Sequence, residues 1–299
     1  MKLYIFGKNG MLGNTFFLYF SKIYDTIGFD RKDFNVLTQD WDGLKQLLIS
    51  NNFQAGDIVL NCIGIIPQKK SPEDEYTIVN SRFPHELSRI TRNLQGILIH
   101  ISTNCVFSHS FNPYSEEDSP VSDDIYGQTK YEGEPLESTI IRTSIIGEEK
   151  KTCVSLLSWA LSSREPIKGY EDHFWNGVTC LQLVKVVHNM IETNFFWKGV
   201  RHIHSNETIS KYELLKLIFT IYNHTTTILP ITTGNSSTKL LSSIYSPILE
   251  IPPLSQQILE QKLFFKKETL EKLAKAFQNS LERNDKFMVI RKWKDLVTR

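Results

Sequence analysis

Two side chains that can move a proton stand four positions apart in YGQTKYEGE, residues 126 to 134. If this stretch is helical, Tyr126 and Lys130 lie on one face of the helix, with the phenol beside the ammonium group. A neighbouring cation lowers the pKa of a phenol and makes it a better acid. The same spacing is also typical of an ordinary pair on a helix surface, so the pair predicts catalysis only where other reactive groups meet it.

A hydroxyl group is placed to meet this pair. Thr103 stands in HISTNCVF, residues 100 to 107, at the end of an apolar run that predicts a strand. In an open parallel sheet, ligands bind beyond the carboxyl ends of the strands, so we expect Thr103 at the ligand crevice. A threonine followed by Tyr-x-x-x-Lys, downstream of a glycine-rich turn, is far more specific than any one of these features.

The glycine-rich turn comes near the start of the chain. Gly7, Gly10 and Gly13 stand in GKNGMLG, after the apolar run LYIF and before a helical pattern. In this context glycines let the backbone approach a pyrophosphate at a helix N-terminus. The spacing is G-x-x-G-x-x-G rather than G-x-G-x-x-G, and a turn that only connects a strand to a helix remains the alternative.

Charged residues end the second predicted strand, in GFDRKDF. An acid such as Asp30 at this place usually meets ribose hydroxyls, and a basic residue such as Arg31 meets a 2′-phosphate. The pair leaves both NADH and NADPH open, and Arg31 favours NADPH. A turn that is merely rich in charges would look the same for either residue alone.

The elements that would position these residues alternate along the first half of the chain. Apolar, β-branched runs predict strands over 3–6, 26–29, 57–63, 96–102 and 138–144. A helix is predicted over 71–93, with Ser71 before it and Pro72 at its first position. This alternation predicts an α/β fold built on a doubly wound parallel Rossmann sheet.

The second half changes character after about residue 145. Strand signals thin, and capping boxes are predicted for Thr179 with Gln182 and for Ser210 with Glu213. We therefore expect two domains. A dinucleotide-binding Rossmann domain would cover 1–145, completed by a helix near 179–193, and a smaller α/β substrate domain would cover 146–299.

Composition excludes several classes of protein. The chain has 299 residues, of which 40% are hydrophobic, and 34 basic and 33 acidic side chains give a formal net charge of +1. This balance argues against an extensive surface for nucleic acid. The four cysteines are widely spaced and predict no metal site and no disulfide framework. We expect a cytoplasmic protein without a membrane span, ending in a solvated basic tail at Arg291, Lys292, Lys294 and Arg299.

Taken together, GKNGMLG, ISTNCVF and YGQTKYEGE resemble the extended short-chain dehydrogenase/reductases, and within them the dTDP-4-dehydrorhamnose reductase-like nucleotide-sugar reductases. NCIGIIPQ at 61–68, VNSRFPHELS at 79–88, IIRTSIIG at 140–147 and FWNGVT at 174–179 are similar to the same family. The resemblance thins after about residue 225. It implies a nucleotide cofactor, NADPH with NADH as an alternative, on the N-terminal domain and a nucleotide-sugar on the C-terminal one.

The resemblance also implies roles for the three reactive residues. Tyr126 would be the general acid that protonates the C4 carbonyl oxygen of the sugar, and Thr103 would polarise that carbonyl. Lys130 would lower the pKa of the phenol and hold the nicotinamide ribose. The cofactor contacts implied by the family, besides Tyr126 and Lys130, are Gly7, Gly10, Met11, Leu12, Gly13, Asp30, Arg31, Cys62, Ile63 and Gly64.

Substrate contacts follow less directly from the resemblance. Asn104 replaces the Asp that many of these reductases carry after the threonine, so its role there can change from acceptor to donor or vanish. Lys239 matches loosely where a basic residue meets the diphosphate, although a loop lysine without a role fits as well. The other residues that the family places at the sugar pocket are Asn80, Arg142, Trp175 and Asn176.

Two other functions stay open. Related bifunctional epimerase/reductases resemble this chain in a Cys two residues after the hydroxyl residue and a basic residue further on, here Cys105 and His173. These two could exchange protons beside the ketone before reduction, although a small Cys often only fills a strand end. The family also includes regulatory subunits that bind a dinucleotide without catalysis. A dehydratase fits worse, because those relatives carry Asp-Glu where this chain has Asn104 and Cys105.

The expected product is an L-rhamnose-type sugar nucleotide, made from a UDP- or dTDP-linked 6-deoxy-4-hexulose. The sequence leaves open the nucleotide and whether C2 carries a hydroxyl or an acetamido group. It also leaves open the oligomeric state, for which a homodimer is one possibility.

Overall fold

The computed structural model describes residues 1–38, 40–149, 154–236 and 238–282, the last ten of these as backbone only. The predicted basic tail at Arg291, Lys292, Lys294 and Arg299 lies outside the described residues.

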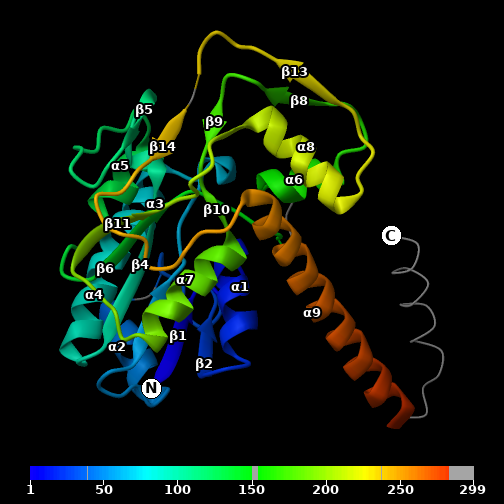
Figure 1. Ribbon diagram of the computed structural model, residues 1–299. Coiled ribbons are helices and arrows are strands. Elements are labelled where there is room, and N and C mark those ends of the chain that lie inside the picture. Colours follow the sequence, from blue (N-terminus) through cyan, green and yellow to red (C-terminus); the bar gives the residue numbers. More distant parts are fainter. Residues whose placement is uncertain (39, 150–153, 237, 283–299) are drawn as a thin grey trace.

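A parallel sheet forms the centre of the molecule (Figure 1). Within the described residues it has six strands in the order β11-β6-β4-β3-β1-β2, and every neighbouring pair in it is parallel. The strands are β1 (Lys2–Phe6), β2 (Asp25–Phe29), β3 (Ile58–Asn61), β4 (Ile97–Thr103), β6 (Thr139–Thr143) and β11 (Gly199–Ile203). The predicted α/β class with a parallel Rossmann sheet is confirmed, and β11 is a strand that the sequence pattern did not predict.

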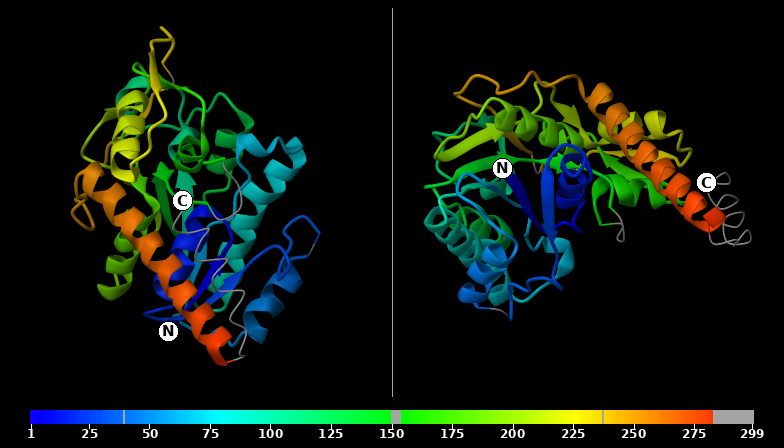
Figure 2. Two further views of the ribbon diagram at one scale, coloured as in Figure 1. Left: turned by 90° about the vertical axis from the view of Figure 1, so that its right-hand side faces the viewer. Right: turned by 90° about the horizontal axis from the view of Figure 1, so that it is seen from below.

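Each face of the sheet is covered by helices, so the central strands β1, β3, β4 and β6 are buried on both sides, while the edge strands β2 and β11 are partly exposed. Leu3 and Ile5 of β1 pack into a core with α1 (Met11–Phe20) and α7 (Cys180–Glu192). Tyr4 and Phe6 of the same strand point the other way, into a core with α2 (Trp41–Ser50) and α4 (Phe83–Asn93). The left view of Figure 2 shows the two helical layers on either side of the sheet.

The helix predicted over 71–93 is interrupted. It consists of α3 (Glu73–Tyr76), a π-helical segment (Thr77–Arg82) and α4, and a short 3-10 turn (Pro67–Lys69) precedes it. Pro84 has no N–H group to donate to the carbonyl of Asn80 four residues earlier, which favours the wider π turn there. The predicted start was also wrong by one residue: α3 begins at Glu73, Pro72 is its N-cap, and no side chain caps it.

The second half of the chain adds short paired strands above the sheet (Figure 1). β7 (Ile145–Ile146) pairs with β10 (Val178–Thr179), β8 (Ile167–Tyr170) with β13 (Ile228–Ile231), β9 (Phe174–Trp175) with β12 (Ile209–Ser210), and β5 (Ser110–Tyr114) with β14 (Lys239–Leu241). Helices α6 (Leu156–Ser162) and α8 (Lys211–Tyr222) share a separate core with the start of α9 (Leu254–Glu282). Within the described residues, no helix is both long and apolar enough to span a membrane.

The predicted capping boxes differ in outcome. At α8 the box is complete, since the Ser210 hydroxyl accepts from the Glu213 N–H and the Glu213 carboxylate accepts from the Ser210 N–H. At α7 only half of it forms. The Thr179 hydroxyl accepts from the Gln182 N–H at 3.2 Å, but within the described residues the buried Gln182 side chain has no hydrogen-bond partner. The Thr179 N–H donates instead to the side chain of Gln257 on α9.

Candidate active site

Thr103 and Tyr126 meet where β4 ends and α5 (Ile125–Glu132) begins. Asp124 caps α5 by accepting from the Gly127 N–H at 2.7 Å. A Cβ on Gly127 would lie 2.1 Å from the carbonyl oxygen of Cys105, so only glycine lets the helix start approach the loop after β4 this closely. The glycine beside Tyr126 thus explains how the phenol reaches Thr103, with which it shares a hydrogen bond.

Burial raises the pKa of the Tyr126 phenol far above its ordinary value, with the charge of Cys105 acting in the same direction and the hydrogen bond with Thr103 opposing it. This is opposite to the lowering that we expected from Lys130. Burial of the phenolate costs more free energy here than its hydrogen bond with Thr103 recovers. The phenol is therefore fully protonated at neutral pH, as a proton donor must be.

Lys130 lies one helical turn after Tyr126 and is only 5% exposed. Its Nζ donates to the carbonyl oxygen of Ile101 on β4 at 2.8 Å and lies 3.5 Å from Nε2 of His100. Burial lowers the pKa of Lys130 to about 8, although the charges of Glu134 and Cys62 oppose this. The ammonium form still dominates at pH 7, so a cation stands behind the phenol.

The glycine turn has the shape of a cradle for a phosphate group. Gly7 has a positive φ of +88°, and a Cβ there would lie 3.1 Å from the carbonyl of Cys62. A Cβ on Gly13 would lie 2.2 Å from the carbonyl oxygen of Gly7, so the first turn of α1 packs directly on the loop. Gly10 precedes α1 as an N-cap without a side chain, and Met11 and Leu12 supply its first backbone N–H groups. These features fit a dinucleotide pyrophosphate.

The end of β2 presents both an acid and basic groups. Asp30 accepts a hydrogen bond from the Asn9 side chain at 2.7 Å, and Nζ of Lys8 lies 3.8 Å from its carboxylate. Lys8 also pairs with Asp33 at 2.9 Å, while Arg31 is exposed. Nζ of Lys8 also donates to the Gly28 carbonyl at 2.8 Å, so Lys8 is already paired within the fold and Arg31 is the exposed cation at this place.

The loop after β3 lies beside this turn. The Cys62 N–H donates to the carbonyl of Phe6 at 3.1 Å, and burial raises the pKa of the Cys62 thiol to about 12 while Lys130 opposes that change. A thiol in this state is uncharged and serves as a small apolar wall. Ile63 and Gly64 continue the loop, with the Ile63 N–H bonded to the Asn61 side chain.

Cys105 and His173 belong to a second group that includes a lysine. The Cys105 N–H donates to the Thr103 hydroxyl at 3.1 Å, and burial lowers the pKa of His173, with the charge of Lys211 next in effect. Lys211 begins α8, and its N–H donates to the His173 carbonyl at 2.9 Å. Burial lowers the pKa of Lys211 too, against the charge of Cys105. Lys211 thus acts electrostatically on His173 and is itself affected by Cys105, while Nε2 of His173 lies 3.1 Å from the Thr233 hydroxyl.

The side chain of Asn104 contacts the backbone of Lys239. The Asn104 side chain donates to the carbonyl oxygen of Lys239 at 2.7 Å, which ties β14 to the loop after β4. Asn104 therefore acts as a donor at this position, in accordance with its difference from the usual Asp.

Four residues predicted to contact the sugar have other tasks in the structure. Asn80 is 1% exposed and bonds both the N–H and the carbonyl of Ile65. Asn176 does the same for Leu241, at 3.1 and 2.7 Å. The buried indole of Trp175 donates its N–H to Ser144 at 2.8 Å.

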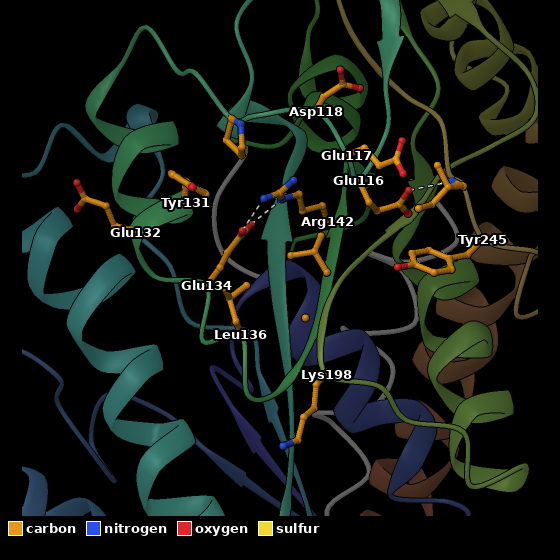
Figure 3. Close-up of a pocket in the computed structure, with 14 residues that line it drawn as sticks. Glu116, Glu117, Asp118, Tyr131, Glu132, Glu134, Leu136, Arg142, Lys198 and Tyr245 are labelled. Atoms are coloured by element: carbon orange, nitrogen blue, oxygen red, sulfur yellow. Dashed lines mark hydrogen bonds and ion pairs between the residues drawn. The ribbon is translucent and has the colours of Figure 1, made fainter.

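Arg142 pairs with an acid of the same half of the chain. Its guanidinium forms two hydrogen bonds of 2.8 and 2.7 Å with the carboxylate of Glu134, and both residues are almost fully buried. Figure 3 shows the two side chains pointing toward each other, in a pocket that Glu116, Tyr131 and Tyr245 also line. Asn80, Arg142 and Asn176 thus each make hydrogen bonds within the fold, and their contact with a sugar stays a prediction.

The sequence analysis missed several residues of the site. His100 and Asn61 gave a signal, since they are polar residues inside apolar runs that predict buried strands. Lys211 gave a weaker one, because it directly follows a capping serine at the start of a helix. Lys8 belongs to the glycine motif, and its long side chain reaches the end of the second strand. The motif alone does not indicate this contact.

Comparisons with known proteins agree with this geometry. A family model described as the RmlD substrate binding domain matches residues 1–279. A dTDP-4-dehydrorhamnose reductase of Mycobacterium tuberculosis is 27% identical over 157 residues, which cover 48% of this chain and 49% of that protein. The match thus spans about half the length of that curated relative.

Two solved structures share the fold. A dTDP-4-dehydrorhamnose reductase of Clostridium acetobutylicum has a TM-score of 0.75 at 19% identity and covers 89% of this chain and 100% of its own. The enzyme of that name from Bacillus anthracis, in complex with NADP, has a TM-score of 0.76 at 21% identity and covers 88% and 98%.

Proposed function

The chain belongs to the RmlD substrate binding domain family, and from this premise we propose that it is an NADPH-dependent reductase of a nucleotide-linked 6-deoxy-4-hexulose. The reaction would reduce the C4 ketone and give an L-rhamnose-type sugar nucleotide. The observation that carries the proposal is the convergence of Thr103, Tyr126 and Lys130 at the carboxyl end of β4. The relatives named dTDP-4-dehydrorhamnose reductase support dTDP as the nucleotide, with UDP as the alternative.

The cofactor site would be formed by the glycine turn and its neighbours. The backbone around Gly7, Gly10 and Gly13 would hold the pyrophosphate at the start of α1. Asp30 would meet the ribose, and Arg31 favours NADPH because a 2′-phosphate needs a cation. The B. anthracis complex with NADP supports this choice. When bound, the nicotinamide supplies the hydride; the protein supplies position and the proton.

The proton would come from Tyr126. Its raised pKa keeps the phenol protonated, and Thr103 beside it would bond the same carbonyl oxygen and polarise it. As negative charge develops on that oxygen, the phenol would give its proton to it. Lys130 would stabilise the phenolate that this step leaves, since its ammonium form dominates at pH 7.

The substrate would be held mainly by the second half of the chain. Residues 1–145, with α7, would form the cofactor domain and 146–299 the sugar-nucleotide domain. Lys211 is a partly buried cation on which Cys105 acts electrostatically, and an anionic or oxygen-rich ligand would stabilise it. Lys239 stays a candidate for the diphosphate. We further propose that the protein acts in the cytoplasm and pairs as a homodimer.

The experiment is NADPH oxidation, followed at the nicotinamide absorbance, with UDP- and dTDP-linked 4-keto-6-deoxy sugars offered before and after 3,5-epimerisation. Oxidation only with the epimerised sugar supports the dedicated reductase and identifies its nucleotide. Oxidation with neither nucleotide would contradict the proposal and favour a regulatory subunit that binds a dinucleotide.

A second candidate function rests on the group formed by Cys105, His173 and Lys211. Lys211 acts electrostatically on His173 and is affected by Cys105, and a thiol and an imidazole could exchange protons at carbons beside the ketone, which is the chemistry of a bifunctional 3,5-epimerase/4-reductase. In that case the unepimerised sugar would also support NADPH oxidation.

A further inference from the structure

A buried polar chain lies behind the catalytic lysine, and the proposed reaction does not use it. Asn61 of β3 and His100 of β4 stand opposite each other in the sheet, and neither is exposed. Nδ2 of Asn61 lies 3.0 Å from Nδ1 of His100, and Nε2 of the same ring lies 3.5 Å from Nζ of Lys130. Polar groups at such a depth cost free energy unless each contact joins a donor to an acceptor.

The backbone fixes the orientation of the Asn61 amide. The N–H of Ile63 donates to Oδ1 of Asn61 at 3.1 Å. A reversed amide would set its NH2 group against that N–H. Nδ2 of Asn61 therefore faces the imidazole and donates to Nδ1.

This contact decides where the imidazole carries its proton. Burial lowers the pKa of His100 well below its usual value, with the charges of Lys130 and His85 adding to the effect, so the ring is neutral. A neutral imidazole whose Nδ1 accepts a hydrogen bond carries its proton on Nε2. Nε2 is the nitrogen that faces Lys130.

We propose that His100, held in this tautomer by Asn61, presents an N–H group to Nζ of Lys130 and so makes the ammonium form of that lysine less stable than it would be without this N–H group. A neutral amine can accept from Nε2–H while it donates to the Ile101 carbonyl at 2.8 Å. An ammonium group has no lone pair and meets Nε2–H as a second donor. His100 is thus a positioning residue that acts through Lys130.

The other titratable groups around Lys130 make no hydrogen bond with its Nζ within the described residues. Tyr126 lies on α5, Glu134 follows that helix and Cys62 follows β3, and the charge of His85 on α4 acts on His100. Glu134 and Cys62 favour the ammonium form. Within the described residues, the hydrogen-bond contacts of Nζ are those with Ile101 and His100. Of these two contacts, only the one with His100 places a donor against the ammonium form of Lys130. Removing the ring N–H therefore removes the contact that disfavours this form.

The consequence for catalysis rests on the proposed function. A lysine with a weakened ammonium form exchanges its proton at a lower pH than an exposed lysine does. Lys130 could then release and regain a proton within the range in which the phenol of Tyr126 stays protonated.

The first test observes the imidazole directly. ¹⁵N NMR of the histidine-labelled full chain distinguishes a ring nitrogen that carries a proton from one that does not, and His100 is identified by the signals lost in His100→Gln. We expect the proton on Nε2 from about pH 6 to about pH 9. A proton on Nδ1, or a charged ring in that range, overturns the proposal whether or not the chain reduces a sugar.

The second test follows the ionisation of Lys130 itself. The ¹³Cε shift of Lys130, assigned by its loss in Lys130→Arg, is titrated in the unchanged chain and in His100→Phe. We expect the midpoint to rise by about one pH unit in His100→Phe, because the opposing donor is gone. The matched control is His188→Gln, whose ring contacts Tyr19 on the α1–α7 side and should leave the midpoint unchanged. An unchanged midpoint in folded His100→Phe contradicts the proposal.

Asn61→Asp provides the same test if His100→Phe does not fold. A carboxylate accepts from both Ile63 N–H and Nδ1, so the proton must move to Nδ1 and Nε2 must accept from Lys130. The two ¹⁵N signals should exchange places, and signals that stay in place would overturn the proposal. None of these readouts needs turnover, so their failure is distinct from an absence of NADPH oxidation.

Discussion

Lys130 lies in the first half of the chain and Lys211 in the second, and the two lysines differ in the hydrogen bonds of their Nζ atoms. Lys130 is 5% exposed and donates to a carbonyl oxygen of β4 at 2.8 Å. Lys211, on the first turn of α8, is partly buried, and no described residue accepts a hydrogen bond from its Nζ. Burial lowers the pKa of both lysines. The sheet thus gives its cation a hydrogen-bond acceptor, whereas no described residue of the second half does the same for Lys211.

The same contrast separates the polar residues around them. Thr103 and Tyr126 come from a strand end and a helix start that pack closely, so the sheet fixes the reactive groups. Asn80 and Asn176 look equally suitable in the sequence but bond the backbone of Ile65 and Leu241. A polar residue is therefore available to a ligand only where the fold has not already paired it.

Tyr126→Phe should have the largest effect. Loss of the general acid should lower kcat by about 10²- to 10⁴-fold, while cofactor binding stays nearly the same. NADPH oxidation measures the first quantity, and quenching of protein fluorescence by NADPH measures the second. Tyr131→Phe is the matched control, because that phenol lies on the same helix and is 46% exposed. Activity close to that of the unchanged chain in Tyr126→Phe would refute the assignment of the acid.

Arg142→Met tests whether this arginine belongs to the fold or to the substrate. It leaves the Glu134 carboxylate buried without its cation, which should lower the free energy of unfolding by about 3–5 kcal/mol. Urea unfolding measures the change. The double variant Glu134→Leu/Arg142→Met should recover much of the loss, since it removes the unpaired charge. A normal unfolding curve with a raised KM would instead restore Arg142 to the substrate site.

The fold was largely predictable because its signals are local. Apolar runs of four to seven residues mark buried parallel strands at any distance from their partners, and all five predicted strands lie in the sheet. β11 was missed because GVRHI mixes Arg201 and His202 with apolar residues at the sheet edge. The interruption near Asn80 was also missed, although Pro84 carries the physical reason for it.

Residues of the candidate site were predictable only where a side chain that can bind or transfer a proton stands at the end of a predicted strand or the start of a predicted helix. Thr103 and Tyr126 stand at element boundaries, where the sheet presents side chains to a crevice. The pairing of Arg142 with Glu134 depends on two side chains meeting across separate elements, and no spacing rule in the sequence states it. The direction of the Tyr126 pKa shift likewise depends on burial, which the sequence does not give for a short polar helix.

Lys211→Met is the next variant in order of effect. If this cation meets the substrate, its loss should weaken substrate binding by about 1.5–3 kcal/mol, or roughly ten- to hundredfold in KM, with a smaller change in kcat. Steady-state kinetics with the sugar nucleotide varied at saturating NADPH separates the two constants.

Lys216→Met is the control for this change, because Lys216 lies on the same helix, is exposed and stacks on Tyr212. An equal change in KM for both variants would show that only the general charge of α8 matters. An unaltered KM in Lys211→Met would remove the proposed difference between the two lysines.

Cys105→Ala should have the smallest effect if the protein only reduces the ketone. The thiol makes one weak contact, 3.8 Å to the Asn104 oxygen, and the Cys105 N–H that binds Thr103 is unchanged by the substitution. Reduction of the epimerised sugar should therefore stay close to that of the unchanged chain, because the hydrogen bond to Thr103 is kept. The decisive comparison uses the unepimerised sugar. If activity on that sugar alone is lost, Cys105 exchanges protons beside the ketone, and the group with His173 and Lys211 performs a second reaction rather than only binding the substrate.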